Sequence, residues 1–180
     1  MPTVLSGSGS ADFATPLPVA EGGTGATSLA LGKVLQVVSV TKTDIFTISA
    51  NTQADITGLA VTITPSLATS KILVTVHVSG SSAYDGVLML YIGSSIVAQG
   101  DAAGVRHLGV SEFPSTNIPG SAPSNSSAFL DSPATTSAIT YKMAAKMNSQ
   151  PGYINRSTTD ANAAHDPRTI STIYVMEIGA

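Results

Sequence analysis

Apolar and polar residues alternate along most of the chain after Val34. The segment "LAVTIT" (59–64) has every second residue apolar, and Pro65 follows it. The segment "KILVTVHV" (71–78) alternates in the same way, with Ile and Val at positions 72, 74, 76 and 78. A period of two is typical of a β-strand that buries one face. Both segments are therefore predicted to be strands.

The same reasoning predicts further strands, separated by turns rich in Gly, Pro and Ser, at residues 34–40, 44–49, 87–92, 96–100, 137–147 and 169–178. Residues 87–92 are apolar on both faces, and "GSS" after them predicts a hairpin. Residues 101–125 are predicted to be a long loop between sheets, and residues 169–178 a mostly buried strand. Only "SLALGK" (28–33) favours a brief helical turn. The expected fold is all-β, an antiparallel jelly roll or β-sandwich.

Residues 1–32 have a different composition. They include "SGSGSADFATPLPVAEGGTGATS", which is rich in Gly, Ser, Pro and Ala and has no sustained period. Such a segment buries too little apolar surface to fold alone. We predict an extended N-terminal arm over 1–32 that becomes ordered against a partner, followed by a β-domain over 33–180. The residues proposed to anchor the arm are Phe13, Leu17, Val19, Gly22, Gly23 and Gly25.

Charged residues form only 11% of the chain, less than half of the usual share of about 25%. It contains 24 Ser and 21 Thr, and its net charge is −3 without a basic cluster. A surface poor in charge and rich in hydroxyl groups favours close packing of subunits. The lack of a basic cluster argues against nucleic-acid binding. The absence of Cys excludes disulfides. No apolar run reaches 18 residues and no signal-peptide pattern begins the chain, so we expect no membrane insertion.

No cofactor motif is complete. The stretch "GTGATSLALGK" (23–33) resembles a phosphate-binding loop, but its Gly spacing is wrong and Val34 follows the Lys. The three histidines, His77, His107 and His165, have no metal-ligand spacing. His77 is expected on a strand, and the other two on loops. In a trimer, one histidine from each chain could still converge on the axis.

Catalysis is not expected either. No Ser lies in a G-x-S-x-G motif. The carboxylates that could form a glycosidase pair are scattered, and they are Asp85, Asp101, Glu112, Asp131, Asp160 and Asp166. Asp131 fits a turn after a strand, where its side chain accepts a backbone N–H. Asp166 fits a turn with an Asp–Arg pair to Arg168. Asn125 and Asn155 begin glycosylation patterns but are interpreted as polar turns.

The segment "INRSTTDANAAHDPR" (154–168) concentrates polar side chains. We interpret it as the end of a strand over 153–155 and an exposed loop that returns to the last strand. Arg156 and Arg168 flank the loop, with Asp160 and Asp166 between them. Asp–Arg pairing is expected to hold this loop, and subunit or receptor contact is favoured over catalysis.

Several segments resemble the C-terminal region of bacteriophage tail-fibre and related virion appendage proteins. They are "TPSLATSKILVTVHVSG", "IVAQGDAAGVR", "FLDSPATTSAITYKM", "GYINRS" and "DPRTISTIYVMEIGA", and the resemblance covers residues 35–180. The segment "LPVAEGGTGATS" is similar to a Gly-rich unit of tail-fibre shafts. This resemblance implies a trimeric jelly-roll head, similar in style to C1q or tumour-necrosis-factor domains, with a structural or host-binding role. The single Gly-rich unit and the lack of heptads depart from a long fibre.

The resulting hypothesis is a non-enzymatic virion protein. It would be a short homotrimeric fibre or spike whose arm binds a tail, collar or capsid protein and whose head serves host attachment. The alternatives are a capsid decoration protein and a host-glycan-binding module. A depolymerase would need a long β-helix, for which the chain has no room. The candidate receptor or subunit contacts are Tyr84, His107, Phe113, Tyr153, Arg156, His165 and Arg168.

Overall fold

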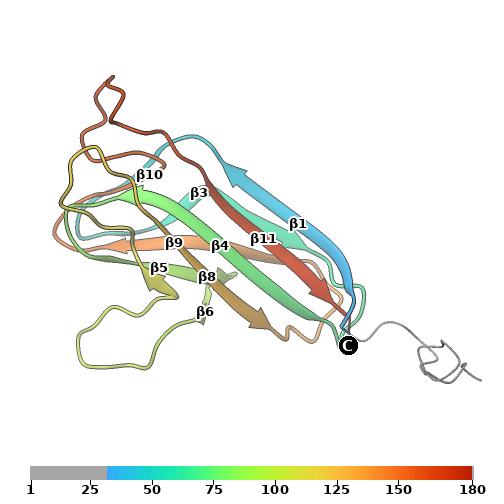
Figure 1. Ribbon diagram of the computed structural model, residues 1–180. Helices are drawn as coiled ribbons and strands as arrows, with labels where there is room; N and C mark the ends of the chain where they lie inside the picture. Colours follow the sequence, from blue (N-terminus) through green and yellow to red (C-terminus); the bar gives the residue numbers. More distant parts are fainter. Residues whose placement is uncertain (1–31, 180) are drawn as a thin grey trace, which may run out of the picture.

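Residues 32–179, the part of the chain that the computed structural model describes, form two antiparallel β-sheets packed face to face (Figure 1). No helix occurs among these residues, and so none that could cross a membrane. The predicted all-β, antiparallel sandwich is therefore confirmed for this part of the chain. The predicted arm, its anchor residues and nearly all of the possible helical turn at 28–33 lie outside the described residues.

The first sheet contains β1 (Val34–Lys42), β11 (Ser171–Ile178), β4 (Lys71–Ser81), β8 (Ser124–Asp131), β10 (Gly152–Ile154) and β2 (Phe46–Ile48). Strands β1, β11, β4 and β8 lie side by side in that order. Beyond the start of β11, the short strand β10 pairs with the end of β4, and β2 pairs with β10.

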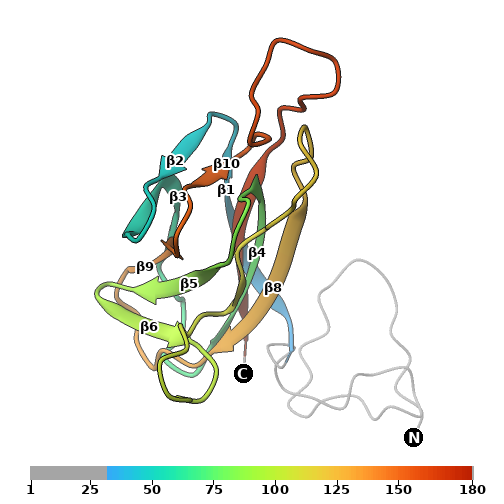
Figure 2. The same cartoon turned by 90° about the vertical axis from the view of Figure 1, so that its left-hand side faces the viewer.

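The second sheet contains β3 (Gln53–Ile63), β9 (Ile139–Met147), β5 (Gly86–Ile92), β6 (Ser95–Ala98) and β7 (Ser111–Glu112). Figure 2 shows the two layers from the side. Successive long strands alternate between the sheets: β3 is in the second, β4 in the first, β5 in the second, β8 in the first, β9 in the second and β11 in the first. Most strand connections therefore cross the sandwich.

The core lies between the sheets and follows the predicted alternation. On β3 the inward residues Leu59, Val61 and Ile63 are buried, and on β4 so are the residues at 72, 74, 76 and 78. On β9 the buried set runs from Ile139 to Met147 at every second position. The last strand differs from the prediction, because only alternate residues of β11 are buried and the others are half-exposed. It is a one-faced strand rather than a mostly buried one.

Residues 101–125 contain more structure than the predicted loop. Strand β7 pairs with Val87 and Leu88 of β5, and Phe113 directly after it is completely buried in the core. Strand β8 begins at Ser124, so Asn125 lies within a strand, opposite Val78. The interpretation of Asn125 as a turn residue is therefore wrong. Its side chain instead donates a hydrogen bond to the Glu112 carbonyl at 2.7 Å.

Glu177 is a completely buried acid that faces the core near the end of β11. Its carboxylate accepts hydrogen bonds from Gln36 Nε2 at 2.6 Å and from the Ser66 backbone N–H at 2.7 Å. Burial alone raises the pKa of Glu177, but these hydrogen bonds outweigh it and hold the pKa below its usual value. The charged carboxylate therefore connects Gln36 of β1 with Ser66, which follows β3, at this end of the sandwich.

A pH titration of stability checks this role. The lowered pKa of Glu177 means that its stabilising effect is present above the ordinary glutamate pKa of about 4.3 and is lost as the pH falls through the folded-state value. Glu177→Gln removes the charge and is expected to cost about 1 to 3 kcal/mol at pH 7. Urea unfolding from pH 7 to pH 3 should show the two proteins converging in acid. A constant difference across that range would contradict the assignment.

Candidate functional site

The segment between β10 and β11 forms a loop at the end of the sandwich opposite the C-terminus (Figure 1). We call residues 157–167 the distal loop. Its base is closed by an antiparallel bridge between Arg156 and Arg168 and by a hydrogen bond from the Thr169 N–H to the Asn155 carbonyl at 3.2 Å. The predicted strand end and returning loop are confirmed, with β10 ending at Ile154.

Asn155 ties this base to the first sheet. It is completely buried and has a positive φ of 60°, a conformation that Asn adopts more readily than most residues. Its amide nitrogen donates to the carbonyls of Lys42 and Asp44, both at 2.9 Å. Its amide oxygen accepts a hydrogen bond from the Ser171 hydroxyl at 2.7 Å. Asn155 is thus a turn residue, as predicted, but also a buried junction, which the sequence pattern did not reveal.

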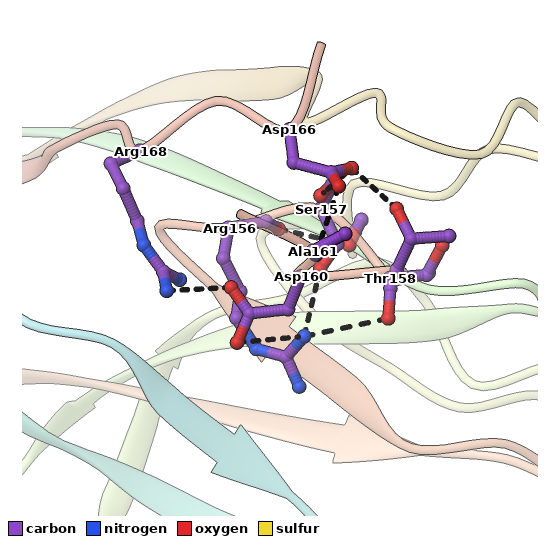
Figure 3. Close-up of polar contacts among 9 residues, drawn as sticks. Arg156, Ser157, Thr158, Asp160, Ala161, Asp166 and Arg168 are labelled. Atoms are coloured by element: carbon purple, nitrogen blue, oxygen red, sulfur yellow. Dashed lines mark hydrogen bonds and ion pairs between the residues drawn. The ribbon is translucent and has the colours of Figure 1, made fainter. Parts of the chain in front are cut away.

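Two arginines hold Asp160 between them (Figure 3). Arg168 Nη2 lies 2.6 Å from one carboxylate oxygen and Arg156 Nη1 lies 3.6 Å from the other. Arg156 also donates to the carbonyls of Ser157 and Thr158, and its guanidinium lies 3.7 Å from the centre of the Tyr153 ring. The expected Asp–Arg pairing is confirmed at Asp160. These contacts fix the loop in one shape.

Asp166 does a different job from the one expected. Its carboxylate accepts hydrogen bonds from the hydroxyls of Ser157 and Thr159 and from the Ala161 N–H. These bonds, that from Thr159 above all, outweigh burial and lower the pKa of Asp166. The predicted pair between Asp166 and Arg168 does not form, because Arg168 is bound to Asp160 instead. Asp166 organises the inside of the distal loop.

Removing the central acid of this loop should loosen it without unfolding the domain. Asp160→Ala breaks both arginine pairs, which are partly exposed, so we expect a loss of about 1 kcal/mol. Backbone amides of residues 157–167 should exchange hydrogen faster, as measured by mass spectrometry, while those of β4 and β9 stay unchanged. Asp101→Ala, in the loop before β7, is a control that should alter neither region. Unchanged exchange in the distal loop of Asp160→Ala would contradict this account.

The predicted contact residues fall into four places. Tyr153, Arg156 and Arg168 meet at the base of the distal loop, and His165 is exposed within it, 3.9 Å from Asp166. Tyr84 lies between β4 and β5 with 57% of its surface exposed, and His107 lies on the exposed loop before β7. Phe113 is fully buried. It is a core residue and not a contact, because its side chain belongs to the hydrophobic core cluster between the sheets.

Two open hollows of about 350 Å³ each lie beside His107. Val87, Arg106 and His107 line both hollows. Asp101 and Glu112 line one, and Asp85 and Asn148 line the other. Their side chains offer charged and hydrogen-bonding groups on an exposed surface. Neither lining set contains a Ser hydroxyl hydrogen-bonded to a base, the arrangement that acyl transfer through a Ser nucleophile requires.

One serine–histidine contact occurs elsewhere. On the outer face of the first sheet, His77 Nδ1 lies 3.0 Å from Ser126 Oγ, across β4 and β8. No carboxylate in residues 32–179 lies within ion-pair distance of His77, so no third group orients the ring as a triad requires. His77 lies on a strand, as predicted. Nor do three His, Asp or Glu side chains converge as a metal site within the described residues.

No family model matches the chain, and no curated protein matches it.

Proposed function

We propose that this chain is a non-enzymatic virion structural protein, a short homotrimeric fibre or spike. Residues 1–32 form an arm that binds another virion protein of the tail, collar or capsid, and the β-domain is a jelly-roll head exposed for host attachment. The proposal builds on the resemblance of the segments over residues 35–180 to bacteriophage tail-fibre and appendage proteins. Two features of the described geometry and the composition of the chain support it.

The observation that carries the proposal is the position of the chain ends. The Gly32 N–H donates to the Gly179 carbonyl at 2.8 Å, and the Gly179 N–H donates to the Lys33 carbonyl at 2.9 Å. Gly32, where the described part of the chain begins, therefore lies beside the end of β11, whereas the distal loop precedes the start of β11. Attachment through the arm would leave the distal loop pointing away from the particle.

The order of the strands supports a jelly roll. The first sheet runs β1-β11-β4-β8 and the second runs β3-β9-β5-β6, with most connections crossing between them. Two four-stranded sheets with crossing connections are typical of that fold. The low charge of the chain supports assembly, because contacts between subunits then bury few charges.

Particle binding tests the division of labour. Deleting residues 1–30 should give a folded trimer that no longer joins particles lacking this protein, whereas the full chain restores it. Labelled full chain should appear as projections from the particle by negative-stain microscopy. A truncated chain that still joins particles would overturn the role of the arm. A full chain that never joins them would overturn the virion assignment.

Binding of a host glycan is a second candidate, favoured by the two hollows beside His107. Their charged and amide side chains are suited to hydrogen bonds with sugar hydroxyls, and Arg106 is suited to an acidic sugar. His107→Ala should abolish binding to a glycan array, while the exposed His165→Ala on the distal loop should leave it unchanged. If the full chain bound none of the host polysaccharides, only the structural role would remain.

A further inference from the structure

The outer face of β1, β11, β4 and β8 carries unusually few charges. Figure 1 looks onto this face, with the four strands side by side in front of the second sheet. The strand register places twelve outward side chains in three rows across the four strands. The rows are Val37–Met176–Leu73–Leu130, then Ser39–Tyr174–Thr75–Ala128, then Thr41–Thr172–His77–Ser126. None is Asp, Glu, Lys or Arg. Lys71, beyond the first row, is the nearest charged residue on β4.

The first row is apolar across the whole sheet, and it is exposed at both edges. Val37 on β1 is 55% exposed and Leu130 on β8 is 47% exposed. Between them, Met176 and Leu73 are half-buried. A continuous exposed apolar row of this kind marks an interaction surface in a folded protein.

The outer face of the second sheet is different. It presents Lys142 and Lys146 of β9 and Asp55 of β3, and Lys142 pairs with Asp55 at 2.6 Å. Its apolar residues Met89 and Tyr91 are already buried within the single chain, where Val87 and Ile96 pack against them. The second sheet therefore needs no partner, and its face serves as an internal comparison for the first.

The geometry points to a second copy of this chain as the partner of the first-sheet face. The three rows carry no charge, so they do not select a partner of opposite charge, whereas two copies meet through them without burying an unpaired charge. Four strands about 4.8 Å apart, over the five residues per strand that the three rows span at about 3.3 Å each, give about 320 Å² of flat area. A standard interface buries about 800 Å² per partner, so the three rows would form its centre and the residues around them its rim.

The pattern of exposure also indicates how the copies meet. A closed ring of three needs two different patches on each copy, because each subunit contacts the next through a head-to-tail interface. The most exposed apolar residues of the row lie at opposite edges, Val37 on β1 and Leu130 on β8. We infer that the β1 edge of one copy contacts the β8 edge of the next, with Leu73 and Met176 facing the axis. This arrangement rests on the homotrimer of the proposed function.

Thiol cross-linking of the full chain tests this arrangement, because the chain has no native Cys. The double variant Val37→Cys/Leu130→Cys should give covalent trimers with a short bis-maleimide. The control Val37→Cys/Thr62→Cys moves one thiol to the exposed face of the second sheet and should give no trimers. Both replaced sites of the test variant are exposed, so folding should persist, and circular dichroism checks it.

The native mass of the unmodified chain, from light scattering, separates the two proposals. A trimer whose Val37→Cys/Leu130→Cys variant stays uncross-linked would overturn the inferred face and leave the homotrimer standing. A monomer would overturn both. Equal cross-linking of the test and control variants would also overturn the inferred face, because it would show contact that does not depend on the first sheet.

Discussion

Replacing Asn155 by alanine is expected to lower the free energy of unfolding by about 3 to 5 kcal/mol. The substitution leaves the carbonyls of Lys42 and Asp44 and the hydroxyl of Ser171 without their amide partner in a buried site. It also places alanine at a φ of 60°. Urea denaturation followed by circular dichroism measures the loss.

Asn51 provides a matched control for the backbone conformation. It has a φ of 55° but is exposed in the turn before β3. Asn51→Ala should therefore cost only the left-handed backbone penalty of about 1 to 2 kcal/mol. The difference between the two variants isolates the buried hydrogen bonds of Asn155. Equal losses would mean that the Asn155 amide contributes little and that backbone conformation alone explains its position.

This junction matters for the proposed function because it connects distant parts of the chain. Asn155 bonds the connection after β1, and its N–H donates to the Ser79 carbonyl of β4 at 2.9 Å. Ser171, at the start of β11, binds both Asn155 and the backbone of Ser79. The distal loop is therefore attached to β4 and β11, two of the four strands that form the outer face of the first sheet. A loop held in this way keeps a fixed orientation relative to any assembly made through that face.

Strands with one buried and one solvated face were predictable from the sequence. Strands β3, β4 and β9 alternate apolar and polar residues so regularly that their buried face follows from the period. Their extent does not, because β3 begins at Gln53 and β4 ends at Ser81, beyond the predicted segments 59–64 and 71–78. The start of strand β8 was not predicted, because its inward positions include Asn125 and Ser127, which hide the alternation. Its end at Asp131 was predicted, and the Asp131 carboxylate accepts the Ser132 N–H there at 2.8 Å. Tertiary hydrogen bonds replace apolar burial there: Tyr141 donates to Asp131 at 2.6 Å. Burial raises the pKa of Tyr141 well above its usual range, and this hydrogen bond raises it further.

The polar sites were predictable only where the partners are close in sequence. The pairing of Asp160 with two nearby arginines follows from charge within the loop, although the competition between Asp160 and Asp166 for Arg168 does not. The Asn155 network joins residues more than 100 positions apart. Glu177 likewise binds Gln36 and Ser66. One local signal was available: Asn after a short strand is a frequent site of positive φ.

The pairing of β4 with β10, which supports the distal loop, leaves no room for a side chain at Gly80. A Cβ placed there would lie 2.3 Å from the Tyr153 carbonyl oxygen and 3.4 Å from the Ile154 Cα. Both are backbone atoms, so relief requires β10 to move away from β4. Gly80→Ala is therefore expected to cost about 3 kcal/mol in urea unfolding. It should also speed hydrogen exchange at the Asn155 amide, which donates to Ser79.

Gly100 supplies the control for that substitution. No atom lies within 4 Å of a Cβ built there, and its φ is not positive. Gly100→Ala should change stability by no more than about 0.5 kcal/mol. If Gly80→Ala were as stable as Gly100→Ala, β10 would have to yield easily, and the distal loop could not be held rigidly by the first sheet. If only Gly80→Ala is destabilised, and if backbone amides of the distal loop exchange hydrogen faster only in that variant, then the close β4–β10 contact keeps the distal loop ordered.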